Sequence, residues 1–152
     1  MHHIARNGDF EVSTDPGRLD LDAIHDFLRR SPWAEGIPRE TLQRAIANSL
    51  CFGASGPAGF VGFARVISDR ATYAYLADVF VLEAFRGRGI GKLLMRAIMS
   101  HPELQGLSRW CLLTRDAHGL YRQSGFESPR HPELYMEISV PGIYARKEPS
   151  NE

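Results

Sequence analysis

The sequence predicts an α+β fold, a mixed and mainly antiparallel central sheet flanked by about four helices, with one β-α-β crossover. Three β-rich runs, at residues 50–54, 60–67 and 72–82, follow one another with only short turns between them, which indicates an antiparallel meander. An amphipathic stretch at 89–100 then separates the third run from another apolar run at 110–114. A strand, a helix and a further strand in that order are typical of a parallel β-α-β unit.

Hydrophobic periodicity predicts the remaining elements. The apolar residues of 20–30 recur on one helical face, and Pro38 suits the first turn of a second helix that ends near Ser49. The other expected elements are a first strand at 10–13, a short helix at 117–124, a last strand at 135–140 and a polar, flexible tail at 145–152. We therefore expect a single domain over residues 1–152.

The run at 72–82 is apolar on both of its alternating faces, as expected of a central strand that is covered on both sides. Asp78 interrupts one of these faces, and a carboxylate in such a place must be paired or functional. Strict alternation would put Tyr73, Tyr75, Ala77, Val79 and Val81 on one face and Ala74, Leu76, Asp78, Phe80 and Leu82 on the other.

Composition and charge exclude several classes of protein. Of 152 residues, 18 are Lys or Arg and 18 are Asp or Glu, so the formal net charge is zero, which argues against a nucleic-acid binder or a membrane-surface protein. The sequence contains neither a signal peptide nor a run of about 20 apolar residues, so we expect a cytoplasmic protein. Two cysteines, Cys51 and Cys111, are too few for a four-thiolate zinc site, and the histidine spacing suggests no ligand set, so we expect no metal site.

The segment from 86 to 92 carries the strongest functional signal. It reads Arg-Gly-Arg-Gly-Ile-Gly-Lys and leads directly into the helix expected at 89–100. Glycines let a ligand approach the backbone closely, and a helix N-terminus carries roughly half a positive charge. Arg86, Arg88 and Lys92 add full charges, so this segment predicts a cradle for a phosphate group.

Two common phosphate-binding motifs do not fit this segment. A Walker A loop requires Ser or Thr after its lysine, whereas Leu93 follows Lys92. A dinucleotide-binding fold requires GxGxxG and an acidic residue at the end of a second strand about 20 residues further on, whereas the glycines here are spaced as GxGxG.

The pattern Arg86-x-x-Gly89-x-Gly91 resembles the R/Q-x-x-G-x-G/A signature of the GNAT family of N-acetyltransferases. Further along, the segment 117–126, AHGLYRQSGF, is similar to the family's A-x-x-L-Y-x-x-x-G-F segment. The likeness covers roughly residues 50–138. One position departs from it, because Thr114 stands where the family often has an asparagine that helps to hold the cofactor.

The resemblance implies a GNAT-type α/β sandwich that binds acetyl-CoA as cosubstrate. The glycine-rich loop would hold the pyrophosphate, and the backbone of the preceding strand would pair with the pantetheine arm. The residues implied are Val79, Phe80, Val81, Arg86, Gly87, Arg88, Gly89, Ile90, Gly91, Lys92, Thr114 and Ala117.

The resemblance also implies a general acid, Tyr121, which would protonate the leaving CoA thiolate. A phenol has a pKa of about 10 and therefore carries its proton at neutral pH. The base is open: Asp78 is the best candidate and Glu83 a second. The alternatives are that Tyr121 only packs beside Phe126 and that Asp78 is a structural carboxylate.

The acceptor pocket is expected between the first two helices and the central strand, lined by Phe27, Arg30, Trp33 and Tyr75. Trp33 could instead anchor the core, and Arg30 could belong to a solvated helix end. The function that follows is transfer of an acetyl group from acetyl-CoA to the primary amine of a small molecule or peptide, by direct attack on the thioester. A non-catalytic acyl-CoA sensor and an interaction module with the same fold are the alternatives, and a homodimer is one assembly left open.

Overall fold

A six-stranded sheet runs through the protein in a computed structural model that describes residues 2–145. Its strands lie in the sheet in chain order: β1 (Ile4–Asn7), β2 (Phe10–Ser13), β3 (Leu50–Gly56), β4 (Gly59–Ser68), β5 (Tyr73–Val81) and β6 (Arg109–Leu112). Of the tail expected at 145–152, all but the first residue lies outside the described residues.

The sheet pairing confirms the meander and the crossover. Strands β1 to β5 are antiparallel to their neighbours, whereas β5 and β6 run parallel, in a register that pairs Tyr73 with Arg109 and Leu76 with Leu112. Helix α3 (Ile90–Met99) makes the connection between these two parallel strands. The long third run of the sequence is therefore a central strand of the sheet, as predicted.

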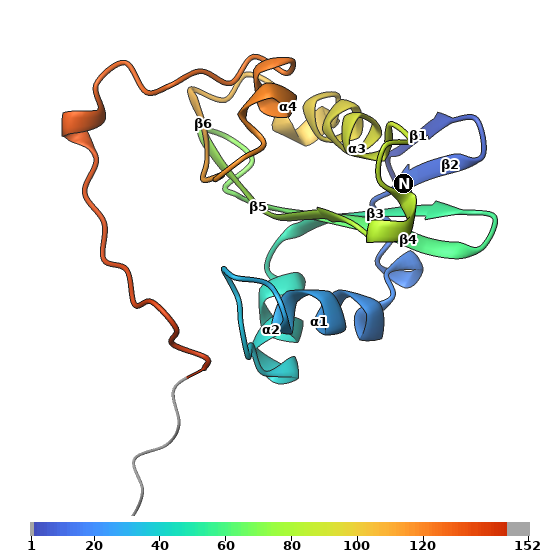
Figure 1. Cartoon of the computed structure of the whole chain (residues 1–152). Coiled ribbons are helices and arrows are strands. Elements are labelled where there is room, and N and C mark those ends of the chain that lie inside the picture. Colours follow the sequence, from blue (N-terminus) through green and yellow to red (C-terminus); the bar gives the residue numbers. More distant parts are fainter. Residues whose placement is uncertain (1, 146–152) are drawn as a thin grey trace, which may run out of the picture.

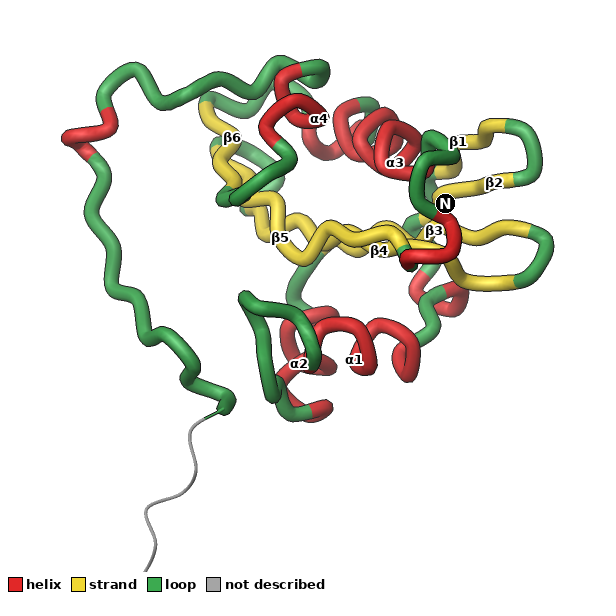
Figure 2. The backbone as a smooth tube through the Cα atoms, viewed as in Figure 1, coloured by secondary structure: helices red, strands yellow, loops and turns green. Residues whose placement is uncertain are grey.

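Helices cover both faces of the sheet (Figures 1 and 2). Helices α1 (Leu21–Arg29) and α2 (Arg39–Ala47) lie on one face, and α3 with the short α4 (His118–Arg122) lies on the other. Each face has its own apolar core, which for α1 and α2 includes Ile24, Leu28, Leu42 and Phe63, and for α3 includes Leu94, Ile98, Phe52 and Val66. Short 3-10 turns occur at Pro16–Arg18, Glu83–Phe85, Pro102–Leu104 and Pro132–Leu134. No helix within residues 2–145 is long and apolar enough to cross a bilayer.

A β-bulge at Asp78 corrects the expected faces of β5. Phe63 pairs with Phe80 and Arg65 with Ala77, so β5 contains one more residue than β4 between these two pairs. Within this stretch Asp78 takes a φ of 53°. The extra residue reverses the alternation. Ahead of the bulge the even-numbered residues Ala74 and Leu76 face the α3 core, whereas beyond it the odd-numbered Val79 and Val81 do so and Phe80 faces α1.

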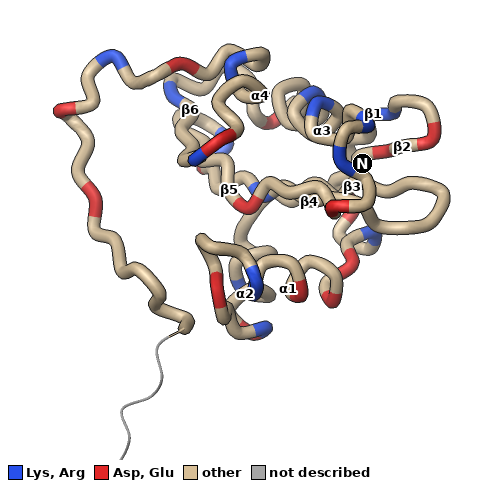
Figure 3. Tube along the Cα trace, in the orientation of Figure 1, with Lys and Arg blue, Asp and Glu red and all other residues tan. Residues whose placement is uncertain are grey.

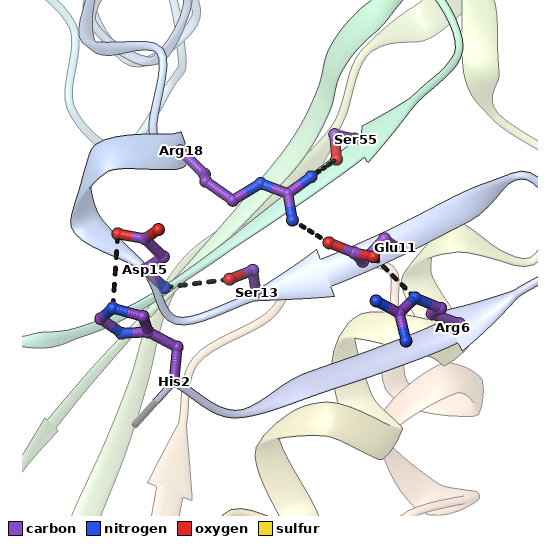
Figure 4. A network of polar contacts seen from close by, with 7 residues as sticks. All are labelled: His2, Arg6, Glu11, Ser13, Asp15, Arg18 and Ser55. Atoms are coloured by element: carbon purple, nitrogen blue, oxygen red, sulfur yellow. Dashed lines mark hydrogen bonds and ion pairs between the residues drawn. The ribbon is translucent and has the colours of Figure 1, made fainter.

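The strand at 10–13 is present, but it is the second strand and not the first. It pairs with β1 through a two-residue turn, Gly8 and Asp9, with Gly8 at a φ of 59°. Figure 4 shows how polar contacts attach this hairpin to its surroundings: Glu11 accepts hydrogen bonds from Arg6 and Arg18, and Arg18 also reaches Ser55 of β3. With two charged or polar residues among its four, β1 lacks the apolar alternation that would have revealed it.

The expected last strand at 135–140 does not form within this chain. These residues are extended but pair with no strand of the described part, and Met136 and Ile138 are fully exposed. The alternating pattern is a correct signal of extended backbone, but a strand forms only where another edge lies beside it. The segment leaves the body after α4 and returns toward the loop between α1 and α2 (Figure 1).

Candidate active site

Strands β5 and β6 diverge and leave an open strand edge between them. Their pairing ends at Leu76 and Leu112, whereas β5 continues for five more residues to Val81. Over that stretch the edge of β5 that faces β6 has no strand partner among the described residues. Such an edge can pair with an extended ligand through its backbone N–H and C=O groups. Val79, Phe80 and Val81, the strand residues expected to hold a cofactor, lie here.

The glycine-rich loop follows β5 directly and ends at the start of α3. Gly87 and Gly89 have φ values of 78° and 81°, a left-handed conformation that glycine adopts without strain. Gly89 is the N-cap of α3, and no side chain caps this end of the helix. The first N–H groups of α3 therefore lack both an intrahelical acceptor and a side-chain acceptor. The space around the loop is open as well, because a Cβ at Gly87 would meet nothing within 4 Å.

Two basic side chains of the loop, Arg86 and Arg88, each contact the segment that precedes the loop. Arg86 Nε donates to the carbonyl oxygen of Val81 at 3.2 Å, and the Arg88 guanidinium lies 5.5 Å from the centre of the Phe85 ring. Ile90, the first residue of α3, is buried in the core and anchors the end of the loop there. Beside the loop, a groove of about 320 Å³ between α3 and α4 is lined by Lys92, Met95, Arg96, Met99, Leu120, Gln123 and Ser124. The segment therefore combines an uncapped helix N-terminus with three cations, Arg86, Arg88 and Lys92.

Tyr121 lies on α4 and is only 8% exposed. Its ring packs edge-on against Phe126, with 6.1 Å between centroids. Burial raises the pKa of its phenol, and the negative charge of Asp116 raises it further. Every buried side-chain oxygen or nitrogen in the described residues has a hydrogen-bond partner. The Tyr121 hydroxyl has none there, so it is not fully enclosed and its O–H donor is not used by another described residue.

The start of α4 is set by Thr114 and Ala117, both expected near the cofactor. The Thr114 hydroxyl accepts a hydrogen bond from the backbone N–H of Ala117 at 3.0 Å. Thr114 thus positions the helix that carries Tyr121.

Asp78 is held by two partners from distant parts of the chain. Trp33 Nε1 donates to its Oδ1 at 2.9 Å, and Arg65 Nε donates to its Oδ2 at 2.8 Å. The Asp78 side chain is only 10% exposed. Tyr75 is close by: burial raises the pKa of its phenol, and the negative charge of Asp78 adds to that effect. The bulge therefore places a carboxylate, a phenol and an indole together.

Aromatic side chains extend this group toward α1. The ring of Phe27 stacks on Phe80, with centroids 3.9 Å apart and an interplanar angle of 8°, and the centroid of Trp33 lies 6.3 Å from that of Phe27. Trp33 is 54% exposed, so it forms the wall of an open surface and not a core anchor. Three of the four expected acceptor residues, Phe27, Trp33 and Tyr75, thus meet beside Asp78.

Arg30 does not join this group. Its guanidinium binds Asp26 one turn earlier on α1, and its side chain is 65% exposed. Arg65, which the sequence did not single out, takes the place of the expected cation. The signal for it was available, since it is the one charged residue in the apolar strand GFVGFARVIS. Within residues 2–145, no three His, Cys, Asp or Glu side chains are grouped so that they could hold a metal ion.

Comparison with known proteins identifies the family. The sequence model described as "Acetyltransferase (GNAT) domain" matches residues 47–128, more than half of the chain. The chain belongs to the GNAT family of acetyltransferases. A crystal structure from Xanthomonas campestris, described as an acetyltransferase of the GNAT family, is 54% identical, has a TM-score of 0.88 and covers 90% of this chain and 97% of its own. The expected fold and enzyme class, an N-acetyltransferase, are confirmed.

Two curated relatives of this GNAT protein are similar over much of its length. A protein of Gibberella zeae named as an acetyltransferase is 34% identical, covering 88% of each chain. Serotonin N-acetyltransferase 2 of rice, Oryza sativa, is 32% identical over 77% of this chain and 61% of its own.

Proposed function

We propose that this GNAT enzyme transfers the acetyl group of acetyl-CoA to a primary amine by direct attack of the amine on the thioester. The observation that carries the proposal is the unpaired edge of β5, which leads straight to the uncapped N-terminus of α3. An extended arm that ends in a phosphate-bearing group matches this geometry, because strand pairing and helix N–H groups would bind its two parts.

The loop fits a pyrophosphate in shape and in charge. Glycines at 87 and 89 leave room for phosphate oxygens, and the free N–H groups of α3 point toward them. Arg86, Arg88 and Lys92 would neutralise the charge. The backbone of Val79, Phe80 and Val81 would pair with the pantetheine arm, with Thr114 and Ala117 on its other side. Acetyl-CoA itself supplies the activated acyl group.

Tyr121 would serve as the general acid. The departing CoA thiolate needs a proton or a strong hydrogen bond, and a buried phenol with a raised pKa holds its proton throughout the neutral range. Its hydroxyl has no competing partner among the described residues.

Asp78 is the candidate base. An amine with a pKa near 10.4 is only about one part in a thousand neutral near pH 7.4, so a group must accept its proton, directly or through water. Trp33 and Arg65 each donate to one oxygen of Asp78, and a lone pair on each oxygen remains for an incoming proton. The same two bonds support the structural alternative, in which Asp78 fastens the Trp33 loop to β5. The two roles predict different results, given in the Discussion.

The surroundings of Asp78 favour an amine that carries an aromatic or apolar group. A carboxylate attracts an ammonium group, and the faces of Phe27, Trp33 and Tyr75 attract both cations and rings. The name of the rice relative, a serotonin N-acetyltransferase, supports an arylalkylamine acceptor. We therefore place primary arylalkylamines ahead of sugar amines and acidic amino acids.

The test is an amine panel in which release of CoA is followed by its free thiol. We expect turnover with primary arylalkylamines such as tryptamine, slower turnover with aliphatic amines of the same length, and none with the N,N-dimethyl derivatives. Reactions without amine correct for the enzyme's own cysteines. Binding of acetyl-CoA without CoA release from any amine would contradict the proposal and favour the acyl-CoA sensor.

A further inference from the structure

The chain after α4 forms an extended arm, residues 127–145, whose middle stands away from the body (Figure 1). Its apolar side chains recur at alternate positions: Leu134, Met136, Ile138 and Val140. Met136 and Ile138 are 97% and 98% exposed. Because alternate residues of an extended chain share one face, Met136 and Ile138 present an apolar face that no described residue covers. Its charged residues are Glu127, Arg130, Glu133 and Glu137, none of which belongs to this alternating set (Figure 3).

A matching open edge lies at the end of the sheet. Strand β6 is last in the strand order and pairs with β5 on one side only. Its other edge has no strand beside it in the described part of the chain, and Leu113, the next residue, is 80% exposed. An unprotected strand edge of this kind readily pairs with an added strand.

The arm does not cover the edge of its own chain. The Arg109 guanidinium lies 5.6 Å from the centre of the Tyr135 ring, so the arm passes the first residue of β6 at Tyr135. In an antiparallel register that places Tyr135 beside Arg109, residues 132–135 would face β6, and Pro132 would lie opposite Leu112. Proline lacks the N–H that a strand ladder needs. Residues 136–140, which have the strand pattern, lie past the end of β6.

The far end of the arm is held at another place. The carbonyl oxygen of Tyr144 lies so close to Gly36 that a Cβ at this glycine would be only 2.8 Å from it. Gly36 belongs to the loop between α1 and α2, the loop that also carries Trp33. The arm therefore contacts the body near both of its ends, whereas its apolar middle and the outer edge of β6 have no partner within residues 2–145.

We propose that residues 134–140 of each copy pair with β6 of a second copy, so that two chains exchange arms in a homodimer. The exchange covers both the apolar face of the arm and the outer edge of β6. Because each chain gives an arm and receives one, the resulting dimer has two-fold symmetry. The exchanged arm would lie beside Leu113 and Thr114, which lead from β6 toward Tyr121. The partner chain would thus support, from its outer side, the strand that borders the opening between β5 and β6. Pairing of the arm with β6 requires neither acetyl-CoA nor an amine to be bound.

Sedimentation of the full chain provides the first test. We expect the wild type to be a dimer and the double variant Met136→Glu/Ile138→Glu to be a monomer with an unchanged circular dichroism spectrum, because both side chains are exposed within one chain. Ile4→Glu is the matched control: Ile4 is 42% exposed on β1, at the opposite edge of the sheet, and its variant should remain a dimer. A monomeric wild type, or a double variant that stays dimeric, would overturn the proposal.

Disulfide crosslinking identifies whose β6 the arm meets. Cys111 lies on β6, whereas Cys51 is buried and its pKa is raised by burial to about 12, so it reacts slowly. Cysteine placed in turn at Met136, Glu137 or Ile138 should give a covalent dimer on mild oxidation from at least one position. That dimer should disappear when Cys111→Ser is added. Closure within one chain, a dimer that survives Cys111→Ser, or no crosslink from any position would each contradict pairing with the partner's β6.

Discussion

The indole nitrogen of Trp33 donates a hydrogen bond to Oδ1 of Asp78 at 2.9 Å, between residues that are 45 apart in the sequence. This bond joins the loop between α1 and α2 to the bulge of β5. The bulge turns the Asp78 side chain toward Arg65 and Trp33, and the loop brings the exposed indole over it. The acceptor side of the proposed site therefore includes a direct contact between a loop and a strand.

Replacing Trp33 with Phe keeps an aromatic surface and removes the N–H group. We expect the KM for the amine to rise about tenfold, which corresponds to about 1.4 kcal/mol, with acetyl-CoA affinity unchanged. Steady-state rates with the amine varied at saturating acetyl-CoA measure this. Trp110→Phe is the control, because Trp110 packs against Phe126 on the α3 side and should leave the amine KM alone. An equal amine KM in wild type and Trp33→Phe would contradict a role of the Trp33 loop in amine binding.

Asp78→Asn tests the candidate base. The amide can still accept from Trp33 but no longer offers Arg65 a charge, and a buried polar mismatch costs about 1–3 kcal/mol, so we expect a lower Tm in either role. If Asp78 accepts the proton, turnover falls by about 10²-fold or more, and the acidic limb of the rate-versus-pH profile is depressed. Acetyl-CoA binding should stay intact. Turnover within a few-fold of wild type, measured well below the Tm, would leave Asp78 with the structural role alone.

Tyr121→Phe removes the proton and keeps the packing against Phe126. We expect turnover to fall by about 10²–10⁴-fold with acetyl-CoA affinity nearly kept. The wild-type profile gives a second readout. The acid works only while protonated, so activity is lost as pH rises through its pKa, and the pKa of Tyr121 is raised by burial above the usual value of about 10. Full activity of the Phe variant would assign the protonation to another group.

Local sequence signals indicate the donor side of the proposed site. The glycine-rich loop and Tyr121 each lie within one short segment, and the spacing inside such a segment fixes which groups face the ligand. Gly87 and Gly89 indeed take the left-handed conformations that a cradle needs. The parallel crossover that delivers the loop to α3 is equally local in origin, because a strand, a helix and a strand follow in order.

The acceptor side could not be predicted in the same way. The bulge depends on Asp78 taking a positive φ, which no local pattern marks at a non-glycine residue. The Arg65 contact joins two strands, and the Trp33 contact joins a loop to a strand, so both depend on tertiary register. The segment 135–140 shows the converse case: its alternation predicts a strand, and that prediction is wrong for the single chain because strand pairing depends on an edge that lies elsewhere.

The most direct test of the central claim, that the β5 edge and the glycine-rich loop bind acetyl-CoA, is the Tm of wild type and two Gly91 variants with and without acetyl-CoA. The backbone of Gly91 is not left-handed, and a Cβ there would make ordinary contact with Leu120 at 3.5 Å, so both variants should fold. Acetyl-CoA at about a hundred times its Kd should raise the wild-type Tm by about 5–10 °C. We predict that Gly91→Ala keeps most of this shift and that Gly91→Glu loses it, because its carboxylate repels the pyrophosphate. An equal shift in wild type and Gly91→Glu would contradict the claim.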